Sequence, residues 1–290
     1  MRKGKWFWIL LIVLSAAALA GYRSLETMRS DNRAPEIHLS GDSLEVSVTD
    51  PQSVLLQGIT ARDNKDGDVT DSLVVESITM LDSDGTVNVV YAAFDSAGNV
   101  AREERQVVYS DYISPRFTLK QPLIYNENST FDVLSNIGAT DVVDGDIQHR
   151  VRATTLGETQ FGDGGNHVVQ FQVTNSLGDT QTGNFPVEVM EADIYDADLE
   201  LTQYIVYLPA GAPFNPASYL KNFVYQRNDI TLSGRVPAGF DLETKGTVQT
   251  HNPGTYTVSY TLTYTEVNEK NPANSREYTA YSKLIVIVEG

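Results

Sequence analysis

The stretch VNVVYAAFDSAGN at residues 87–99 places β-branched and aromatic side chains at alternate positions and then ends in DSAGN. A period of two is typical of a β-strand with one buried face, and Asp, Gly and Asn favour the turn that follows it. HVVQFQVTNSLGD at 167–179 has the same pattern, and GTYTVSYTLTY at 254–264 repeats it more loosely. The sequence therefore predicts a strand–turn unit that recurs along the chain.

Two further landmarks recur in the same order with a period of about 80 residues. Asp31-x3-Pro35 returns as Asp111-x3-Pro115, and the DGD motif at 66–68 returns at 144–146. Turn sequences punctuate the strands at intervals of roughly 8–12 residues, which is typical of a β-sandwich. The predicted organisation is a membrane anchor or signal peptide at 1–22, a linker at 23–35, and domains at 36–110, 111–192 and 193–290. We expect all-β domains, three tandem Ig-like antiparallel sandwiches that stand end to end.

The first of these domains resembles a known family through two motifs. They are GITARDNKDGDVT at 58–70 and VVYAAFDSAGN at 89–99, in that order. Together they resemble the bacterial Ig-like domains named after a pesticidal crystal protein, which occur in tandem on bacterial surface proteins. The second domain keeps DGD but has Asn175 and Asp179 where the first has Asp95 and Asn99, and the third domain is divergent. The resemblance implies β-sandwiches, extracellular display and no catalytic activity.

The N-terminal segment predicts contact with a membrane. Three cations, Arg2, Lys3 and Lys5, precede an uncharged apolar run at residues 6–22. A helix of that length spans about 26 Å, close to the ~30 Å hydrocarbon core of a bilayer. Cations before the run predict a single-pass protein of the cell membrane, with a cytoplasmic N-terminus and an extracellular body. The alternative is secretion after signal cleavage near Ala20, because small residues there fit a signal-peptidase site.

Composition excludes several classes of function. The chain has 38 acidic and 21 basic residues, a net charge of −17, and no cysteine. An acidic body repels a phosphate backbone, so nucleic acid is not an expected partner. The lack of cysteine excludes disulfides, thiolate zinc sites and thiol nucleophiles. No two of the four histidines have the HExxH spacing, and SYLK at 218–221 is an isolated match to an SxxK motif. We therefore expect no enzyme and no resident cofactor, with Ca²⁺ as the one open possibility.

The two DGD motifs raise the question of calcium, because calcium prefers carboxylate and carbonyl oxygens in flexible loops. Their spacing is not that of an EF-hand, since placing Gly67 at loop position six puts Arg62 and Leu73 where acids are required. The alternative is a structural turn, in which the Asp side chains bind nearby amides. The candidate ligands are Asp63, Asp66, Asp68, Asp141, Asp144 and Asp146.

The third domain is rich in tyrosine, which serves equally in cross-strand packing and in binding platforms. Our first hypothesis is a membrane-tethered bacterial surface protein, non-catalytic, acting as an adhesive, scaffold or spacer. The alternative is a carbohydrate-binding or polysaccharide-assembly accessory that uses these rings. The surface protein or polysaccharide that the chain would bind is unknown from sequence. The tyrosines of this hypothesis include Tyr204, Tyr207, Tyr219, Tyr225, Tyr256, Tyr260, Tyr264, Tyr278 and Tyr281.

Overall fold

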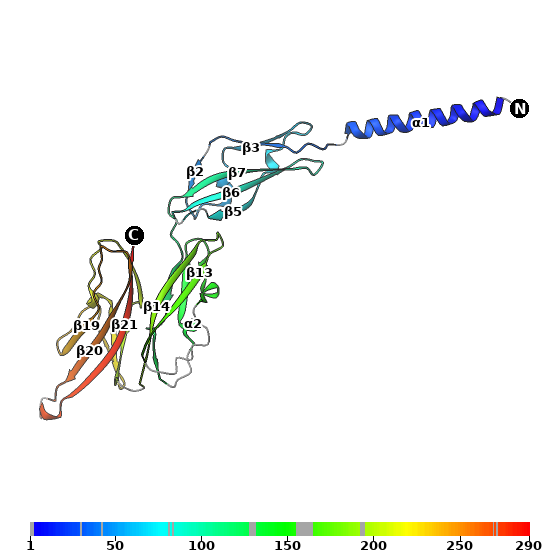
Figure 1. Ribbon diagram of the computed structural model, residues 1–290. Coiled ribbons are helices and arrows are strands. Elements are labelled where there is room, and N and C mark those ends of the chain that lie inside the picture. Colours follow the sequence, from blue (N-terminus) through cyan, green and yellow to red (C-terminus); the bar gives the residue numbers. More distant parts are fainter. Residues whose placement is uncertain are drawn as a thin grey trace. The chain divides into compact units, whose positions relative to one another are not determined.

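The computed structural model divides the chain into two compact units, Met1–Tyr112 and Ile113–Gly290 (Figure 1). The expected boundary between residues 192 and 193 lies outside the described part of the chain. The structure describes residues 3–29, 31–41, 43–80, 82, 84–127, 132–154, 165–191, 195–268, 270 and 272–290.

The first unit begins with a long apolar helix, α1 (Lys3–Arg29), of 27 residues. At 1.5 Å per residue the helix is about 40 Å long, enough to cross a bilayer. No other described part of the protein buries its predominantly apolar 18-residue span, Trp6–Arg23. The helix continues beyond residue 22 into the segment expected to be a linker, because no proline interrupts residues 23–29.

The β-domain of the first unit consists of two sheets, in the orders β1-β3-β4 and β2-β7-β6-β5. Neighbouring strands are antiparallel except for β2, which pairs in parallel with β7. Alternate residues of β6, Val87, Val89 and Tyr91, are fully buried, as the period-two pattern predicts. The strands are β1 (Glu36–Leu39), β2 (Ser43–Val46), β3 (Ile59–Asp63), β4 (Gly67–Asp68), β5 (Val74–Met80), β6 (Thr86–Phe94) and β7 (Val100–Tyr109).

The N-terminal half of the second unit repeats this arrangement with sheets β11-β10-β8 and β12-β13-β14-β9. Strand β9 pairs in parallel with β14, as β2 does with β7. The elements are β8 (Arg116–Leu119), β9 (Ile124–Asn126), α2 (Val133–Asn136), β10 (Ile137–Asp141), β11 (Gly145–Asp146), β12 (Arg152–Ala153), β13 (Gly165–Thr174) and β14 (Thr180–Met190).

The C-terminal half of the second unit forms one continuous hydrogen-bonded sheet of seven strands, in the order β18-β17-β15-β21-β20-β19, with β16 also on β21. Strand β15 connects β17 to β21 in this sheet, because it pairs with β17 and also with Ala280 and Tyr281 of β21. The strands are β15 (Ala197–Leu201), β16 (Ile205–Pro209), β17 (Leu220–Tyr225), β18 (Asn228–Thr231), β19 (Phe240–Lys245), β20 (Gly254–Glu266) and β21 (Arg276–Glu289).

The same strand exchange occurs three times. In each case the first strand pairs antiparallel with the next long strand, and its continuation pairs in parallel with the last strand. The first strand and its continuation are β1 and β2 in the first case, β8 and β9 in the second, and β15 and β16 in the third. A first strand that changes sheet in this way closes both edges of a sandwich.

The two halves of the second unit pack side by side. Ile205 and Ile285 belong to the same buried cluster as Phe117, Phe171 and Phe185. Polar contacts also join the two halves, including the hydrogen bond from the N–H of Phe117 to Tyr207 and the ion pair of Lys283 with Glu188. The expectation that the domains stand end to end is therefore wrong for residues 113–290. The reason is that β16 and β21 carry apolar side chains on both faces, so the face turned away from their own core needs a second partner.

Candidate functional site

Three aspartates converge at the loops that follow β3 and β6 in the first unit. Asp63 is the last residue of β3, Asp95 follows β6, and Asp31 lies in the segment that leads into β1. One carboxylate oxygen of each lies within 4.8 Å of the others. Asp63 and Asp95 are only 4% and 8% exposed, whereas Asp31 is half-buried. The ends of β3 and β6 and the segment before β1 therefore bring three carboxylates together.

Asp63 has one satisfied and one unsatisfied oxygen. Its Oδ1 accepts hydrogen bonds from the backbone N–H groups of Asp66 (2.8 Å) and Lys65 (2.7 Å). Both bonds lower the pKa of Asp63, and the bond from Asp66 has the larger effect on it. The side chain is therefore a carboxylate at neutral pH. Its Oδ2 is buried and has no hydrogen-bond partner among the described residues.

Asp95 is held by Asn99, four residues further along the turn. The backbone N–H of Asn99 donates to Oδ1 at 2.8 Å, and Nδ2 donates to Oδ2 at 2.7 Å. Burial acts to raise the pKa of Asp95, but the hydrogen bonds from Asn99 outweigh it and the pKa is lowered. Nδ2 of Asn99 also donates to the backbone carbonyl of Asp31 at 3.2 Å, which fixes the incoming segment beside the turn.

The two acids of the first DGD motif, Asp66 and Asp68, form turn hydrogen bonds. The carboxylate of Asp66 accepts from the backbone N–H and the hydroxyl of Ser96, at 2.7 and 2.9 Å. Asp68 accepts from the N–H of Thr70 at 3.0 Å, and hydrogen bonds from the side chain and backbone of Thr70 lower its pKa. Asp66 therefore ties the β3–β4 hairpin to the turn after β6, and Asp68 starts the next short turn.

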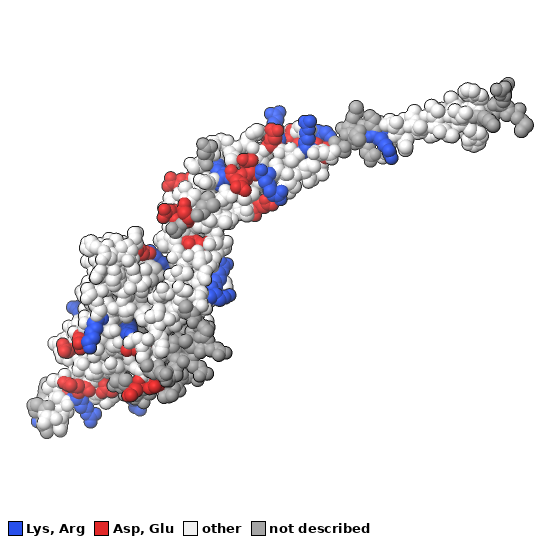
Figure 2. All heavy atoms as spheres, viewed as in Figure 1, with Lys and Arg blue, Asp and Glu red and all other residues white. Residues whose placement is uncertain are grey.

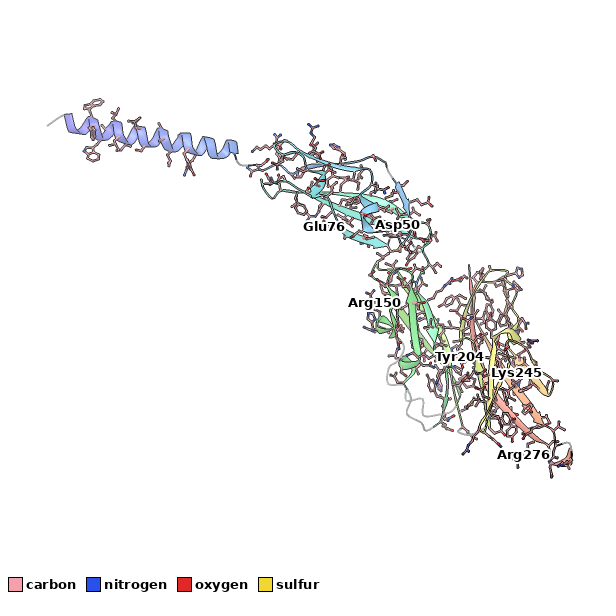
Figure 3. The ribbon with its side chains drawn as sticks, turned by 180° about the vertical axis from the view of Figure 1, so that it is seen from behind. Asp50, Glu76, Arg150, Tyr204, Lys245 and Arg276 are labelled. Carbon is pink, nitrogen blue, oxygen red and sulfur yellow. The ribbon has the colours of Figure 1, made fainter. Side chains whose placement is uncertain are left out.

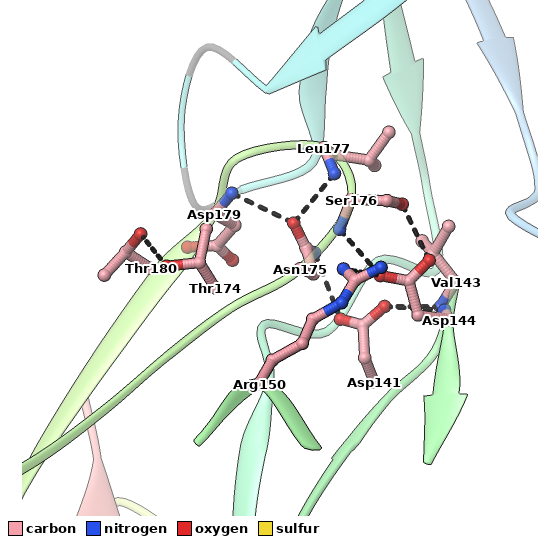
Figure 4. A network of polar contacts seen from close by, with 10 residues as sticks. All are labelled: Asp141, Val143, Asp144, Arg150, Thr174, Asn175, Ser176, Leu177, Asp179 and Thr180. Carbon is pink, nitrogen blue, oxygen red and sulfur yellow. Dashed lines mark hydrogen bonds and ion pairs between the residues drawn. The ribbon is translucent and has the colours of Figure 1, made fainter. Parts of the chain in front are cut away.

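The second unit holds the corresponding residues in a different state (Figure 4). Oδ1 of Asp141 accepts from the N–H groups of Val143 and Asp144, both at 2.9 Å. Its Oδ2 accepts from Nδ2 of Asn175 at 3.1 Å, where the first unit has Asp95 in place of an amide. The buried oxygen that is unpartnered in the first unit is thus satisfied in the second.

Asp144 and Asp146 complete the predicted set. Asp144 accepts from the N–H and hydroxyl of Ser176, at 2.6 and 2.7 Å, and pairs with Arg150 at 2.8 Å (Figure 4). Burial acts to raise the pKa of Asp144, but the bonds from Ser176 and the charge of Arg150 lower it. Asp146 accepts from the N–H of Gln148 at 2.9 Å. The structure therefore brings Asp63 into a carboxylate cluster and places the other five in turns.

Sequence reasoning missed two members of the cluster, Asp31 and Asp95. Both were visible as repeat positions, in Asp31-x3-Pro35 and in DSAGN, but only as markers of the period. Three carboxylates drawn from positions about 30 residues apart give no local spacing signal, because the sandwich topology alone brings the strand ends together. A signal was present in the departure at residue 175, where the second repeat exchanges an acid for an amide.

The ten tyrosines of residues 193–290 are all buried or half-buried. Tyr225, Tyr260 and Tyr278 belong to the core of the C-terminal half, and Tyr225 packs against Tyr278 with ring centroids 4.5 Å apart. Burial raises the pKa of Tyr260 and of Tyr207, the latter to about 12. Tyr204 packs against the same core and is labelled within the second unit in Figure 3. These rings pack the sheets and present no exposed aromatic face.

No family model and no curated protein matches this chain. Among solved structures it is similar to CBM51-2 in complex with GlcNAc and INT domains from Clostridium perfringens ZmpB, at 16% identity and a TM-score of 0.21 over 88% of this chain. This chain covers 41% of that ZmpB chain. It is also similar to Drosophila N-cadherin EC1-4, at 12% identity and a TM-score of 0.22, covering 89% of this chain and 76% of that one. A third similar structure is protocadherin gamma B7 extracellular cadherin domains 1–4, at 13% identity and a TM-score of 0.20, covering 87% and 76%.

These likenesses concern the fold alone. The sheets described above confirm the expected fold class, an all-β chain of largely antiparallel sheets after an N-terminal apolar helix. The resemblance to the bacterial Ig-like family stays a prediction.

Proposed function

We propose that this chain is a membrane-tethered, outward-facing bacterial surface protein whose β-domains act as a non-catalytic adhesive, scaffold or spacer module. The observation that carries the proposal is the surface of α1. Its large apolar side chains between Trp6 and Tyr22 are 46–73% exposed, and Figure 2 draws this part of the helix almost free of charged side chains. An apolar surface of this length is stable only in contact with hydrocarbon, so a bilayer is the natural partner.

Charge supports the outward orientation. The cations at positions 2, 3 and 5 precede the helix, and positively charged flanks stay in the cytoplasm. The β-domains follow the helix and are therefore on the other side. Their interspersed acidic and basic side chains (Figure 2) suit a soluble exterior surface.

The loop chemistry supports a non-catalytic role. Asp66, Asp141 and Asp144 accept hydrogen bonds from backbone amides, serine hydroxyls or Arg150, which are structural roles. A sugar-binding platform built on the tyrosines of residues 193–290 has less support, because none of those ten tyrosines is exposed. The GlcNAc complex belongs to the ZmpB protein. At a TM-score of 0.21, the likeness does not support sugar binding by this chain.

The tether is tested by expressing the full chain in bacteria and extracting the membranes with alkaline carbonate. The wild type should stay in the membrane pellet, keep residues 1–22 by intact mass, and lose its β-domains when protease is added outside spheroplasts. The double variant Leu11→Arg/Leu14→Arg should leave the pellet, because each arginine at the centre of a span costs about 2.5–3.5 kcal/mol.

The matched control is Leu11→Val/Leu14→Val, which keeps the span apolar and should behave as wild type. Recovery of the wild type from the soluble cytoplasmic fraction, or β-domains protected from external protease, would contradict the proposal. A mass lacking the first 20 or so residues would favour the secreted alternative, as expected for signal cleavage.

A further inference from the structure

The cluster in the first unit has the chemistry of a cation site. Three carboxylates from separate segments place oxygens within 4.8 Å of one another, and two of these side chains are more than nine-tenths buried. Like charges this close repel, and the charge of Asp63 acts to raise the pKa of Asp95. Despite this, hydrogen bonds keep the pKa of Asp63 and that of Asp95 below the ordinary value, so both side chains are carboxylates at neutral pH.

A second, independent observation is the unpartnered oxygen of Asp63. Buried carboxylate oxygens are almost always hydrogen-bonded or bound to a metal, because an unpaired one carries the full cost of desolvation. Oδ1 of Asp63 has two amide donors, while Oδ2 is buried with no partner among the described residues. In the second unit the equivalent oxygen, Oδ2 of Asp141, faces residue 175, so Oδ2 of Asp63 faces residue 95 and the cluster.

The second unit shows how the same place is closed without an ion. There Asn175 supplies an N–H donor to Asp141 at 3.1 Å and removes one negative charge. The equivalent of Asp31 is also diverted, because Asp111 accepts from the hydroxyl of Ser47 and from the N–H of Val48, at 2.6 and 2.8 Å. The chain thus contains one open and one closed version of the same loop arrangement.

We propose that Asp31, Asp63 and Asp95 bind one calcium ion in the first unit. Calcium takes six to eight oxygen ligands in flexible geometry, which suits carboxylates delivered by separate loops with water completing the shell beside half-buried Asp31. Magnesium suits the place less well, since it demands an octahedral shell and gives up water reluctantly. Of the candidates raised from sequence, Asp63 is a ligand, and Asp66, Asp68, Asp141, Asp144 and Asp146 are turn residues.

The ion would join the segment leading from α1 to the loops of the sandwich. Asp31 lies between the end of α1 at Arg29 and the start of β1 at Glu36, while Asp63 and Asp95 end strands of opposite sheets. Bound calcium therefore restrains the connection between the apolar helix and the β-domain. This inference goes beyond the proposed function and does not depend on it.

The test is the calcium dependence of unfolding and binding in the full chain, purified in detergent. With a dissociation constant of about 10⁻⁴–10⁻³ M, typical of extracellular modules, about 10 mM Ca²⁺ should raise the melting temperature of the first unit by a few degrees relative to chelator. Isothermal titration calorimetry should give one site. The same concentration of Mg²⁺ should give a clearly smaller shift.

Two variants and one control decide the outcome. Asp63→Asn and Asp95→Asn should each weaken binding at least tenfold and remove the calcium shift. Asp95→Asn copies the amide arrangement of the second unit, so it is expected to fold even where Asp63→Asn does not. The control Asp146→Asn removes one acid from the DGD motif of the second unit and should keep the full shift.

Three results would each overturn the proposal. They are the absence of a calcium shift in the wild type, an unchanged shift in Asp95→Asn, and an equal shift with magnesium, which would indicate general screening of the acidic chain.

Discussion

Arg105 shows how far the environment of a single residue departs from local sequence. It lies on β7 in the charged run AREERQ, yet it is 5% exposed. Its guanidinium donates to the backbone carbonyls of Leu55 (2.7 Å) and Gln57 (3.1 Å) and to the hydroxyl of Tyr91 (3.1 Å). The same group lies 5.5 Å from the centre of the Tyr91 ring. A planar fork with several donors suits this set of acceptors, and an ammonium group does not.

We therefore expect Arg105→Lys to lower the unfolding free energy of the first unit by about 1–3 kcal/mol, because buried acceptors lose their donors. Urea unfolding of the full chain measures the change. The control is Arg102→Lys, which should change stability much less than Arg105→Lys, because the ion pair of Arg102 with Glu76 is exposed to solvent. Equal losses in the two variants would show that the buried contacts of Arg105 are not special.

At the scale of elements, turns decide how strands meet, and two glycines illustrate different constraints. Gly67, in the β3–β4 hairpin, has φ +78° and open space where a Cβ would stand. Gly246, directly after β19, has φ +106°, and a Cβ there would lie 2.1 Å from the backbone carbonyl oxygen of Thr257. The first position requires only the left-handed conformation, whereas the second also requires close approach of two backbones.

Gly67→Ala should therefore lower the unfolding free energy of the first unit by about 1–2 kcal/mol, because an L-residue is strained in the left-handed conformation. Gly246→Ala should cost clearly more, since the backbone near Thr257 must also move. Each loss is measured on the transition of the unit that holds the glycine. If Gly246→Ala cost no more than Gly67→Ala, close packing of the β19 turn on β20 would not be a constraint.

At the scale of the whole molecule, the second unit is held together by contacts between its two halves. Phe117 donates its backbone N–H to the hydroxyl of Tyr207 at 2.7 Å, and Tyr207 also lies beneath the guanidinium of Arg116. Glu188 accepts from the hydroxyl of Tyr281 at 2.9 Å and pairs with Lys283. The side chain of Lys283 is largely buried. The two halves are therefore joined by specific polar contacts as well as by the apolar core.

Calorimetry of the full chain should accordingly show one unfolding transition for each compact unit. Ile285→Ala should lower the unfolding free energy of the second unit by about 2–5 kcal/mol, because it opens a cavity in the shared core. The transition of the first unit should stay unchanged. Hydrogen exchange should show β13–β14 and β20–β21 losing protection together.

The control Val107→Ala should affect only the first transition, because Val107 is fully buried on β7 of the first unit. Full protection of β13–β14 in Ile285→Ala would indicate that the halves unfold independently.

Part of the lateral packing was readable in advance. The run Leu284-Ile285-Val286-Ile287-Val288 is apolar at every position, and a strand of that kind is buried on both faces. The expectation that the domains stand end to end did not use this pattern, and the pattern does not show which surface covers the second face of β21. The candidate site was predictable to the same partial degree. Asp63 follows from the DGD motif, while Asp31 and Asp95 join it only through the topology of the sheets.

Strands, turns and the apolar N-terminal helix followed from periodicity and turn chemistry, because those signals act over a few neighbouring residues. The open oxygen of Asp63, the burial of Arg105 and the shared core around Ile285 came only from the folded chain. Each of these joins residues dozens of positions apart, and local patterns carry no information on which distant surfaces meet. The decisive contacts arise from the way two layers of strands close over one another.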